Sequence, residues 1–401
     1  MKTLVEIIRC EMAARGILSF ARFMELALYC PVYGYYETKK DTPGRRGDFY
    51  TNVSVGELFG QLLAFQFAEW LGTEVRSQKS EIRIVEAGAH DGQLAKDILN
   101  GLQSRRPKLF EQIQYAIIEP SARRQKWQKE KLAEFAPRVC WFTGIEDLKL
   151  KTRNSKLSGI IFSNELLDAM PVRRFGWDAA KKLWFEWGVA IEGGKFVWAR
   201  IQNPEVRSQK SELNLPSVLR HLPAALLAVL PDGYTIETCP AAENWWREAA
   251  SLLERGRLMT IDYGLTADEL FSPSRTRGTL RAYFRHRASD DILANVGEQD
   301  LTAHVNFSAI QTAGESAGLT TESFPTQPQF LTRILEKTLK DKSFGELVAS
   351  KRLVSPKSDG GGSEDGWTSA QARQFQTLTH PEHLGRAFRV LVQLRPLAIR
   401  S

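Results

Sequence analysis

Cysteine is scarce in this sequence, and long hydrophobic runs are missing. The 401 residues include four cysteines, and no two of them lie within four residues of each other. This spacing excludes a cysteine-based zinc site, and four cysteines are too few for a disulfide framework. We therefore expect no metal and a reducing compartment. The most apolar stretch, near 222–230, is short and has prolines within and after it, so we expect no membrane-spanning helix.

The sequence has no acidic excess, and we expect no targeting segment among its first residues. Lys and Arg number 54 against 47 Asp and Glu, a net charge of +7, which permits an acidic partner without requiring nucleic acid. Glu6 and Glu11 lie among the first apolar residues, whereas a secretory signal needs an uninterrupted apolar run and a transit peptide avoids acids. We therefore expect a cytoplasmic protein. Hydrophobic residues make up 43%, which supplies a core and excludes disorder as the main state.

Short apolar runs alternate with helical segments through much of the chain. The apolar runs that we predict to be strands are 82–87, 115–119, 139–143, 159–163, 258–262 and 387–394. The segments with helical patterns are 3–30, 55–71, 93–102 and 121–135. This alternation predicts an α/β fold with a mostly parallel sheet and helices on both faces.

The length of the chain allows two or three domains. We predict a helical cap and a pocket-lining loop over 1–75. A core follows over 76–264 and carries a β-hairpin insertion at about 172–255. Residues 265–401 would form a lid or substrate region, which includes a flexible linker at about 355–366 and the final strand.

Two short features mark loops in this organisation. Gly193-Gly194 is a candidate hairpin turn inside the insertion, among tryptophans that we interpret as packing residues. The octapeptide EVRSQKSE occurs at 74–81 and again at 205–212. Both copies are polar and lie between predicted elements, so we interpret them as tolerated surface-loop inserts.

A glycine-containing turn follows the first predicted strand, from Glu86 through Gly88 to Gly92. Such a turn lets a ligand approach backbone N–H groups at the start of a helix. His90 stands at the middle glycine position of the G-x-G-x-x-G pattern, so the motif alone leaves two alternatives open, a nucleotide site and a structural tight turn. Glu119 ends the second strand, where an acid can accept hydrogen bonds from ribose hydroxyls or can stabilise a helix N-terminus.

A second polar cluster follows the fourth strand. Asn164, Glu165 and Asp168 lie where the carboxyl edge of a parallel sheet binds ligands. The two carboxylates would share one face if this turn were helical. The alternative is a helix N-terminus with favourable acids. Further along, the arginine-rich segment 275–287 fits a nucleic-acid strip or, more simply, a solvated basic face, and we interpret His304 as structural.

Taken in order, these segments resemble the MidA-type family of S-adenosylmethionine-dependent methyltransferases, which includes a mitochondrial arginine methyltransferase that assists assembly of respiratory complex I. The matching segments are 31–36, 47–51, 58–60, 88–92, 118–121, 164–173, 262–264, 278–283 and 297–307. The chain departs from the family at His90, which is usually glycine, and at 52–56, which is commonly Ser-Pro-Glu-Ile-Ser.

The resemblance implies a class I, Rossmann-like methyltransferase whose cofactor is S-adenosylmethionine. It assigns the glycine turn to the methionine part of the cofactor, Glu119 to the ribose, and the segment 47–51 to the lining of the same pocket. The cofactor-binding residues expected on this basis are Glu86, Gly88, Gly92, Glu119, Asp48, Phe49 and Thr51.

The leading hypothesis is methyl transfer to an arginine in a protein substrate, such as a respiratory-complex subunit. A guanidinium is cationic and a poor nucleophile, so a pair of carboxylates could clamp it and localise a lone pair. We assign this catalytic role to Glu165 and Asp168, with Asn164 orienting.

Other functions stay open at this point. The same fold could methylate a different protein or a small molecule, because fold does not fix the substrate. A non-catalytic cofactor-binding assembly factor is favoured by His90 in the glycine turn. An NAD-dependent oxidoreductase is disfavoured by the same residue, and nucleic-acid binding through 275–287 is the least favoured hypothesis. The oligomeric state does not follow from the sequence.

Overall fold

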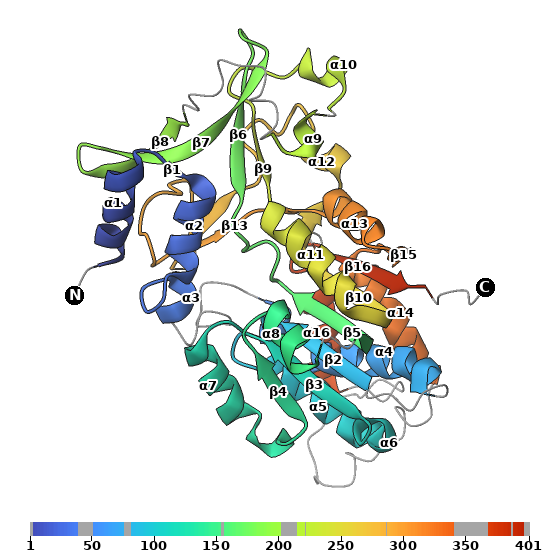
Figure 1. Cartoon of the computed structure of the whole chain (residues 1–401). Helices are drawn as coiled ribbons and strands as arrows, with labels where there is room; N and C mark the ends of the chain where they lie inside the picture. The colour runs from blue at the N-terminus through green and yellow to red at the C-terminus, as the bar shows by residue number, and fades with distance from the viewer. Residues whose placement is uncertain are drawn as a thin grey trace.

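A central sheet organises this protein (Figure 1). The computed structural model describes residues 3–38, 51–75, 82–153, 156–201, 215–220, 222–285, 287–340, 368–385 and 388–396. The strands of the sheet run in the order β15-β16-β10-β5-β2-β3-β4, and β14 pairs with β10. Their bounds are β2 Ile82–Ala87, β3 Ile113–Ile118, β4 Val139–Phe142, β5 Leu157–Asn164, β10 Leu253–Leu265, β14 Val305–Asn306, β15 Thr320–Ser323 and β16 Phe388–Arg395.

The pairing of these strands confirms the predicted mostly parallel sheet. Strands β4, β3, β2, β5 and β10 pair in parallel with their neighbours. Strand β16 runs antiparallel to both β10 and β15, so it is inserted between two strands of the same direction. The carboxyl ends of β2, β5 and β10 therefore meet at one edge, where ligands bind in open α/β sheets.

Helices cover both faces of this sheet, as the alternating pattern predicts. One face is covered by α4 Leu58–Val75, α5 Gln93–Arg105, α14 Gln327–Lys340 and α16 Ser369–Thr379. The other face is covered by α8 Ile145–Lys151, α11 Pro240–Leu252 and α13 Phe307–Ser316. Helix α4 thus packs with the core although the predicted division places it in the N-terminal unit. Helices α13 and α14 also pack with the core rather than apart from it as a lid.

A buried tryptophan joins α11 to the central sheet. The Trp246 indole is fully buried, and its Nε1 donates a hydrogen bond of 2.7 Å to Oε1 of Gln393 on β16. Trp246→Phe would leave that buried oxygen without its donor and would open a cavity. We expect a loss of about 2 kcal/mol in the free energy of unfolding, measured by urea denaturation. Trp245→Phe, at a half-buried position on the same helix, is the control and should cost less than half as much; equal losses would contradict this role of the Trp246 indole.

A second sheet forms the upper part of the molecule (Figure 1). It runs in the order β1-β7-β6-β9, with β8 paired to β7. Its strands are β1 Leu18–Ser19, β6 Arg173–Asp178, β7 Leu183–Glu192, β8 Lys195–Arg200 and β9 Thr235–Thr238. The predicted turn at Gly193-Gly194 is confirmed, because both glycines have positive φ, 55° and 79°, and join β7 to β8 as a two-residue hairpin.

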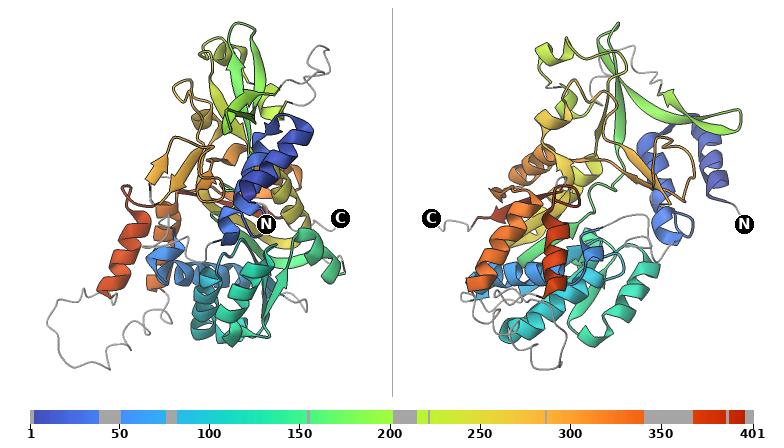
Figure 2. Two further views of the ribbon diagram at one scale, coloured as in Figure 1. Left: turned by 90° about the vertical axis from the view of Figure 1, so that its left-hand side faces the viewer. Right: turned by 180° about the vertical axis from the view of Figure 1, so that it is seen from behind.

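The N-terminal helices pack against this second sheet, in front of it in the left view of Figure 2. The helical pattern predicted over 3–30 is divided into α1 Leu4–Arg15 and α2 Phe20–Tyr29. Gly16 ends α1 with a φ of 76°, and Ser19 caps α2 by accepting the backbone N–H of Arg22. No helix among the described residues is long and apolar enough to cross a membrane.

A third, smaller sheet lies above the carboxyl edge of the core. It consists of β11 Arg281–Phe284, β12 Arg287–Ser289 and β13 Asp300–Thr302. With α3 Tyr35–Thr38 and the short helix η1 Val53–Val55, it faces the ends of the parallel strands. Outside the described residues lie Asp48, Phe49, the linker 355–366, the octapeptide at 205–212 and most of the copy at 74–81.

Candidate active site

A cavity of about 680 Å³ opens at the carboxyl ends of the parallel strands. Its wall takes residues from the ends of β2, β5 and β10, from the glycine turn, from α3 and η1, and from the third sheet. The predicted site residues on this wall are Thr51, Glu86, Gly88, Asn164, Glu165 and Asp168. The chain segments that sequence reasoning linked therefore do meet in one place, with the exceptions described below.

Gly88 lets the chain turn sharply into the cavity wall. Its φ is 75°, and a Cβ added there would lie 2.9 Å from Cδ1 of Leu166. His90 also has a positive φ, 45°, and lines the cavity. Gly92 is not part of the wall; it caps α5 with a φ of 85°, and a Cβ there would lie 3.5 Å from Gln128. Space would allow a Cβ there, so it is the left-handed backbone at the start of α5 that favours glycine; the predicted cofactor role of Gly92 stays a prediction.

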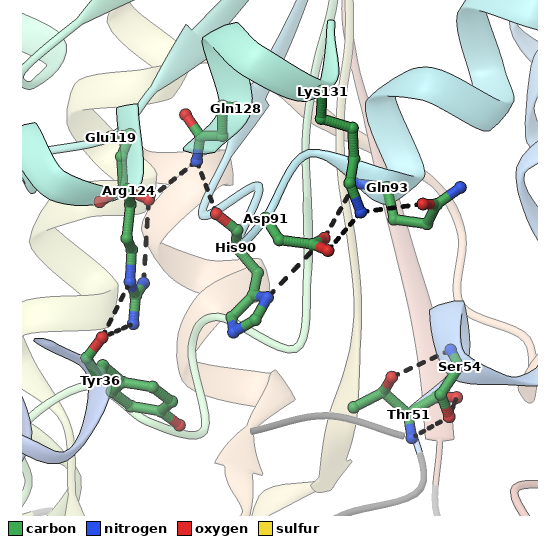
Figure 3. A network of polar contacts seen from close by, with 10 residues as sticks. All are labelled: Tyr36, Thr51, Ser54, His90, Asp91, Gln93, Glu119, Arg124, Gln128 and Lys131. Atoms are coloured by element: carbon green, nitrogen blue, oxygen red, sulfur yellow. Dashed lines mark hydrogen bonds and ion pairs between the residues drawn. The ribbon is translucent and has the colours of Figure 1, made fainter. Parts of the chain in front are cut away.

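The glycine turn is tied to α7 Ala122–Lys131 by a polar network (Figure 3). Gln128 donates to the carbonyl of His90 at 2.9 Å and to Oε2 of Glu119 at 3.3 Å. Lys131 forms an ion pair with Asp91, whose Oδ1 lies 3.8 Å from Nδ1 of His90. Burial raises the pKa of Asp91, but its contacts with His90 and Lys131 outweigh that and lower it. The turn therefore keeps its shape through charged and amide contacts.

Glu119 lies just outside the cavity wall at the end of β3. Its carboxylate is 2% exposed and accepts the backbone N–H of Ser121, the residue that caps α7, at 3.0 Å. Nη1 of Arg124 lies 3.8 Å from Oε2 of Glu119, and Nε of Arg124 donates to the carbonyl of Tyr36 (Figure 3). Burial raises the pKa of Glu119. The structure thus shows the helix-terminal role that the sequence left as an alternative, and the ribose contact stays a prediction.

Glu86 is a buried acid at the end of β2. It accepts a hydrogen bond of 2.6 Å from the hydroxyl of Tyr115. Burial raises the pKa of Glu86 to about 8. It therefore lines the cavity as a proton-bearing group near neutral pH, and a cationic ligand would favour its ionised form.

The segment after β5 is a turn and not a helix, so the condition for placing its acids on one helical face is not met. Glu165 has a φ of 51°, and the N–H groups of Leu166 and Leu167 donate to Oδ2 of Asp262 at 3.2 and 2.8 Å. These bonds replace the backbone bonds that a helix would make. The turn still directs both Glu165 and Asp168 to the cavity wall.

The acids on this wall hold protons more tightly than exposed acids do. Burial and the neighbouring charge of Asp168 raise the pKa of Glu165 to about 8. Burial, with Asp262 and Asp300 nearby, raises the pKa of Asp168 well above its usual range. Asp262 is not part of the wall but binds the turn that carries Glu165, and burial raises its pKa to about 7. Crowded acids of this kind favour a positively charged ligand, because a cation relieves their repulsion.

Several wall residues were not predicted as site residues. Asp300, His304 and Tyr263 line the cavity, and so do Arg281 and Tyr283. Arg281 and Tyr283 come from the segment interpreted as a solvated basic face; Arg281 is exposed, as that interpretation expects, whereas Tyr283 is half-buried in the wall. Burial lowers the pKa of His304 to about 4, so its ring is neutral at pH 7. Arg281, Tyr283 and Asp300 reach the cavity on the third sheet, and Tyr263 reaches it at the end of β10. Their long separation in the sequence from the other wall residues hid them.

The donor set on this wall fits an adenosyl sulfonium cofactor. The turn at Gly88 brings the backbone to the cavity without a side chain, and the acids around it complement a positive charge. Among the residues that the structure places, no group of His, Cys, Asp and Glu could hold a metal ion. The fold and this site define a Rossmann-like enzyme that binds a nucleoside cofactor at the carboxyl edge of its sheet.

The chain belongs to the family described as "Putative S-adenosyl-L-methionine-dependent methyltransferase", whose profile matches residues 62–324. A solved protein from Burkholderia thailandensis, bound to S-adenosyl-homocysteine, is 30% identical over 98% of this chain and 92% of that chain, with a TM-score of 0.75. The chain is thus an S-adenosylmethionine-dependent methyltransferase, and S-adenosylmethionine is its cofactor.

Curated relatives extend the similarity to named enzymes. The mitochondrial protein arginine methyltransferase NDUFAF7 of Danio rerio is 26% identical over 340 residues, which cover 77% of this chain and 71% of that protein. Its homolog from Drosophila melanogaster is 25% identical over 338 residues, or 79% of this chain and 71% of that protein.

Proposed function

We propose that this enzyme transfers a methyl group to an arginine side chain of a protein substrate. The observation that carries the proposal is the acidic wall made by Glu165, Asp168 and Asp300 beside the glycine turn. A guanidinium presents up to five N–H donors in a planar fork, which matches carboxylate oxygens. The names of the relatives from Danio rerio and Drosophila melanogaster support the same acceptor.

The chemistry requires positioning more than activation of the donor. S-adenosylmethionine supplies a methyl group that is already electrophilic. A guanidinium nitrogen is a poor nucleophile because its lone pair is delocalised. Glu165 and Asp168 would bind the cation, fix its plane and concentrate electron density on the nitrogen that faces the methyl group. His304 lines the same wall, but its lowered pKa makes it a poor base, so the proton that leaves the substituted nitrogen would pass to an ionised carboxylate such as Glu165 or Asp168.

The raised pKa of Glu165 predicts how activity depends on pH. Below about pH 8 this carboxyl is largely protonated in the free enzyme and cannot pair with a guanidinium. We therefore expect kcat/KM for the protein acceptor to rise with pH and to level off above about 8, because ionisation of Glu165 precedes acceptor binding. Initial-rate measurements from pH 6 to 9.5 (roughly the range around that pKa) test this.

A matched variant assigns the pH dependence to one residue. Glu165→Gln has no proton to lose, so the rising limb that belongs to Glu165 should disappear from its weak residual activity. A limb that stays unchanged in this variant would instead belong to another acid, such as Asp168 or Asp262. That outcome would contradict the proposed role of Glu165.

The acceptor itself is identified by labelling. Purified enzyme, incubated with methyl-labelled cofactor and lysate from cells that lack the gene, should label a protein band. Acid hydrolysis of that band should release the label as methylated arginine. Label in another amino acid or in a small molecule would overturn the arginine assignment while leaving the methyltransferase class intact. The absence of any label would favour a cofactor-binding assembly factor.

We propose a division of labour between the sheets on the same basis. The central sheet binds the cofactor. The acceptor side chain enters the cavity along the wall that the third sheet and α3 form. That the substrate is a respiratory-complex subunit and that the enzyme is cytoplasmic stay predictions. Identifying the labelled protein and its compartment would test both.

A further inference from the structure

Two fully buried amides outside the predicted site are linked to Glu165. Asn52 precedes η1, and Gln327 begins α14 on the face of the sheet that carries α4 and α16. Both side chains have 0% exposure. Oε1 of Gln327 has no hydrogen-bond partner, but the other polar atoms of the two amides do. Because most buried polar groups are hydrogen-bonded inside the protein, the direction of these bonds carries information.

The hydrogen bonds form a directed series that ends at the carboxylate. Nε2 of Gln327 donates to Oδ1 of Asn52 at 2.8 Å. Nδ2 of Asn52 then donates to Oδ1 of Asn164 at 3.3 Å. Nδ2 of Asn164 in turn donates to Oε1 of Glu165 at 3.1 Å. In each of these bonds the amide nitrogen is the donor to the next residue. We call this series of Gln327, Asn52 and Asn164 the amide relay.

Both ends of the relay are fixed. At one end, Nε2 of Gln327 also donates to the carbonyl of Leu378 on α16 at 2.9 Å. At the other end, the backbone N–H of Asn52 donates to the same Oε1 of Glu165 at 3.1 Å. Oε1 therefore receives two donors. Within the described ranges of the chain, no hydrogen bond reaches Oε2 of Glu165, so that oxygen is left for a ligand.

We propose that Asn52 and Gln327 are positioning residues that hold the Asn164 amide in one orientation and thereby fix the Glu165 carboxylate for the acceptor guanidinium. The proposal rests on the proposed function for the identity of the acceptor, but the orientation of the carboxylate can be tested without it. It also makes the α14–α16 layer, which contributes no predicted site residue, a determinant of the acceptor site.

The physical consequence of the relay is electrostatic. Donors to a carboxylate stabilise its charged form, so Asn164 and Asn52 oppose the burial and the neighbouring acids that favour its neutral form. The groups that act on Glu165 from the surrounding elements are Asp168, Asp262, Asp300 and the hydroxyl of Tyr263. Without the relay, the Asn164 amide could turn its oxygen toward Glu165, and the carboxyl would hold its proton to higher pH.

The test measures the titration of Glu165 directly. Protein labelled with ¹³C at glutamate carboxyls is titrated by NMR, and the Glu165 signal is assigned by its loss in Glu165→Gln. Asn52→Ala should move this titration upward by about half a pH unit or more. Gln327→Met keeps Asn52 and tests the relay if Asn52→Ala does not fold. This variant should move the titration of Glu165 in the same direction by a smaller amount. Thr332→Ala, at an exposed position on the same helix, should leave it unchanged.

Turnover measured with Asn52→Ala in the native enzyme and in the Glu165→Gln variant distinguishes a positioning role of Asn52 from a general structural role. In the native background, Asn52→Ala should lower kcat for the labelled acceptor about tenfold, while the Kd for S-adenosyl-homocysteine stays within twofold. In the Glu165→Gln background the same substitution should change kcat less than twofold, because the group it positions is gone. Equal losses in both backgrounds, or an unmoved Glu165 titration, would overturn the proposal. A moved titration with a non-arginine acceptor would retain the relay and overturn only the proposed substrate.

Discussion

Glu165→Gln should lower kcat/KM for the protein acceptor by about 100- to 1,000-fold, and Asp168→Asn should do the same within a factor of about ten. Both substitutions keep the shape of the side chain and remove the negative charge that would pair with the guanidinium. The Kd for S-adenosyl-homocysteine, measured by calorimetry, should change less than about threefold in Glu165→Gln, since its contacts are assigned to the acceptor.

The double variant distinguishes a shared clamp from two separate roles. If both acids bind one guanidinium, the combined loss should be smaller than the product of the single losses. Glu254→Gln, an exposed acid at the start of β10, serves as the control and should keep native activity. Near-native transfer in either single variant would exclude the clamp, and a parallel loss of S-adenosyl-homocysteine affinity would assign the acids to the cofactor instead.

Gly88→Val should abolish cofactor binding and with it all turnover. The backbone at Gly88 has a φ of 75°, which a β-branched residue adopts only with strain of about 1–3 kcal/mol. A Cβ there would also lie 2.9 Å from Cδ1 of Leu166, so the Leu166 side chain, which follows Glu165, would have to move. We expect the affinity for S-adenosyl-homocysteine to fall at least about 100-fold, because the turn can no longer present its backbone to the ligand.

A second glycine supplies a matched control for strain alone. Gly233 has nearly the same φ, 74°, and a Cβ there would meet nothing within 4 Å. It does not belong to the cavity wall. Gly233→Val should therefore lower stability by a comparable strain cost while keeping cofactor affinity. If the two valine variants lose affinity equally, the effect of Gly88→Val comes from general destabilisation and not from the cofactor turn.

The strands of the core could be predicted because each is a short run of apolar residues. Strand β5 is buried along almost its entire length, and β2 and β3 are nearly as deeply buried. A strand covered on both faces needs apolar side chains at successive positions, and this leaves a local signal. Strand β15 is only four residues long and half exposed, so it lacks that signal and was not predicted.

The site was predictable in part for the same reason. Residues that directly follow buried strands, such as Glu86, Gly88 and Glu165, could be placed at the sheet edge from the sequence alone. The condition that the segment of Glu165 and Asp168 is helical is not met: it forms a turn whose N–H groups donate to Asp262, almost a hundred residues later. No local pattern reports a bond between segments so far apart.

The sequence by itself determined the class of fold, the order of the core strands along the chain and the glycine turn, since these depend on hydrophobicity and backbone freedom within a few residues. Tertiary structure decided which polar groups share the cavity. Asp300 and His304 reach it through the third sheet, and Gln327 reaches Glu165 through two intervening amides. Hydrogen bonds and charges act over a few ångströms in space whatever the separation along the chain, so the chemistry of the site could be inferred only when the strands were placed side by side.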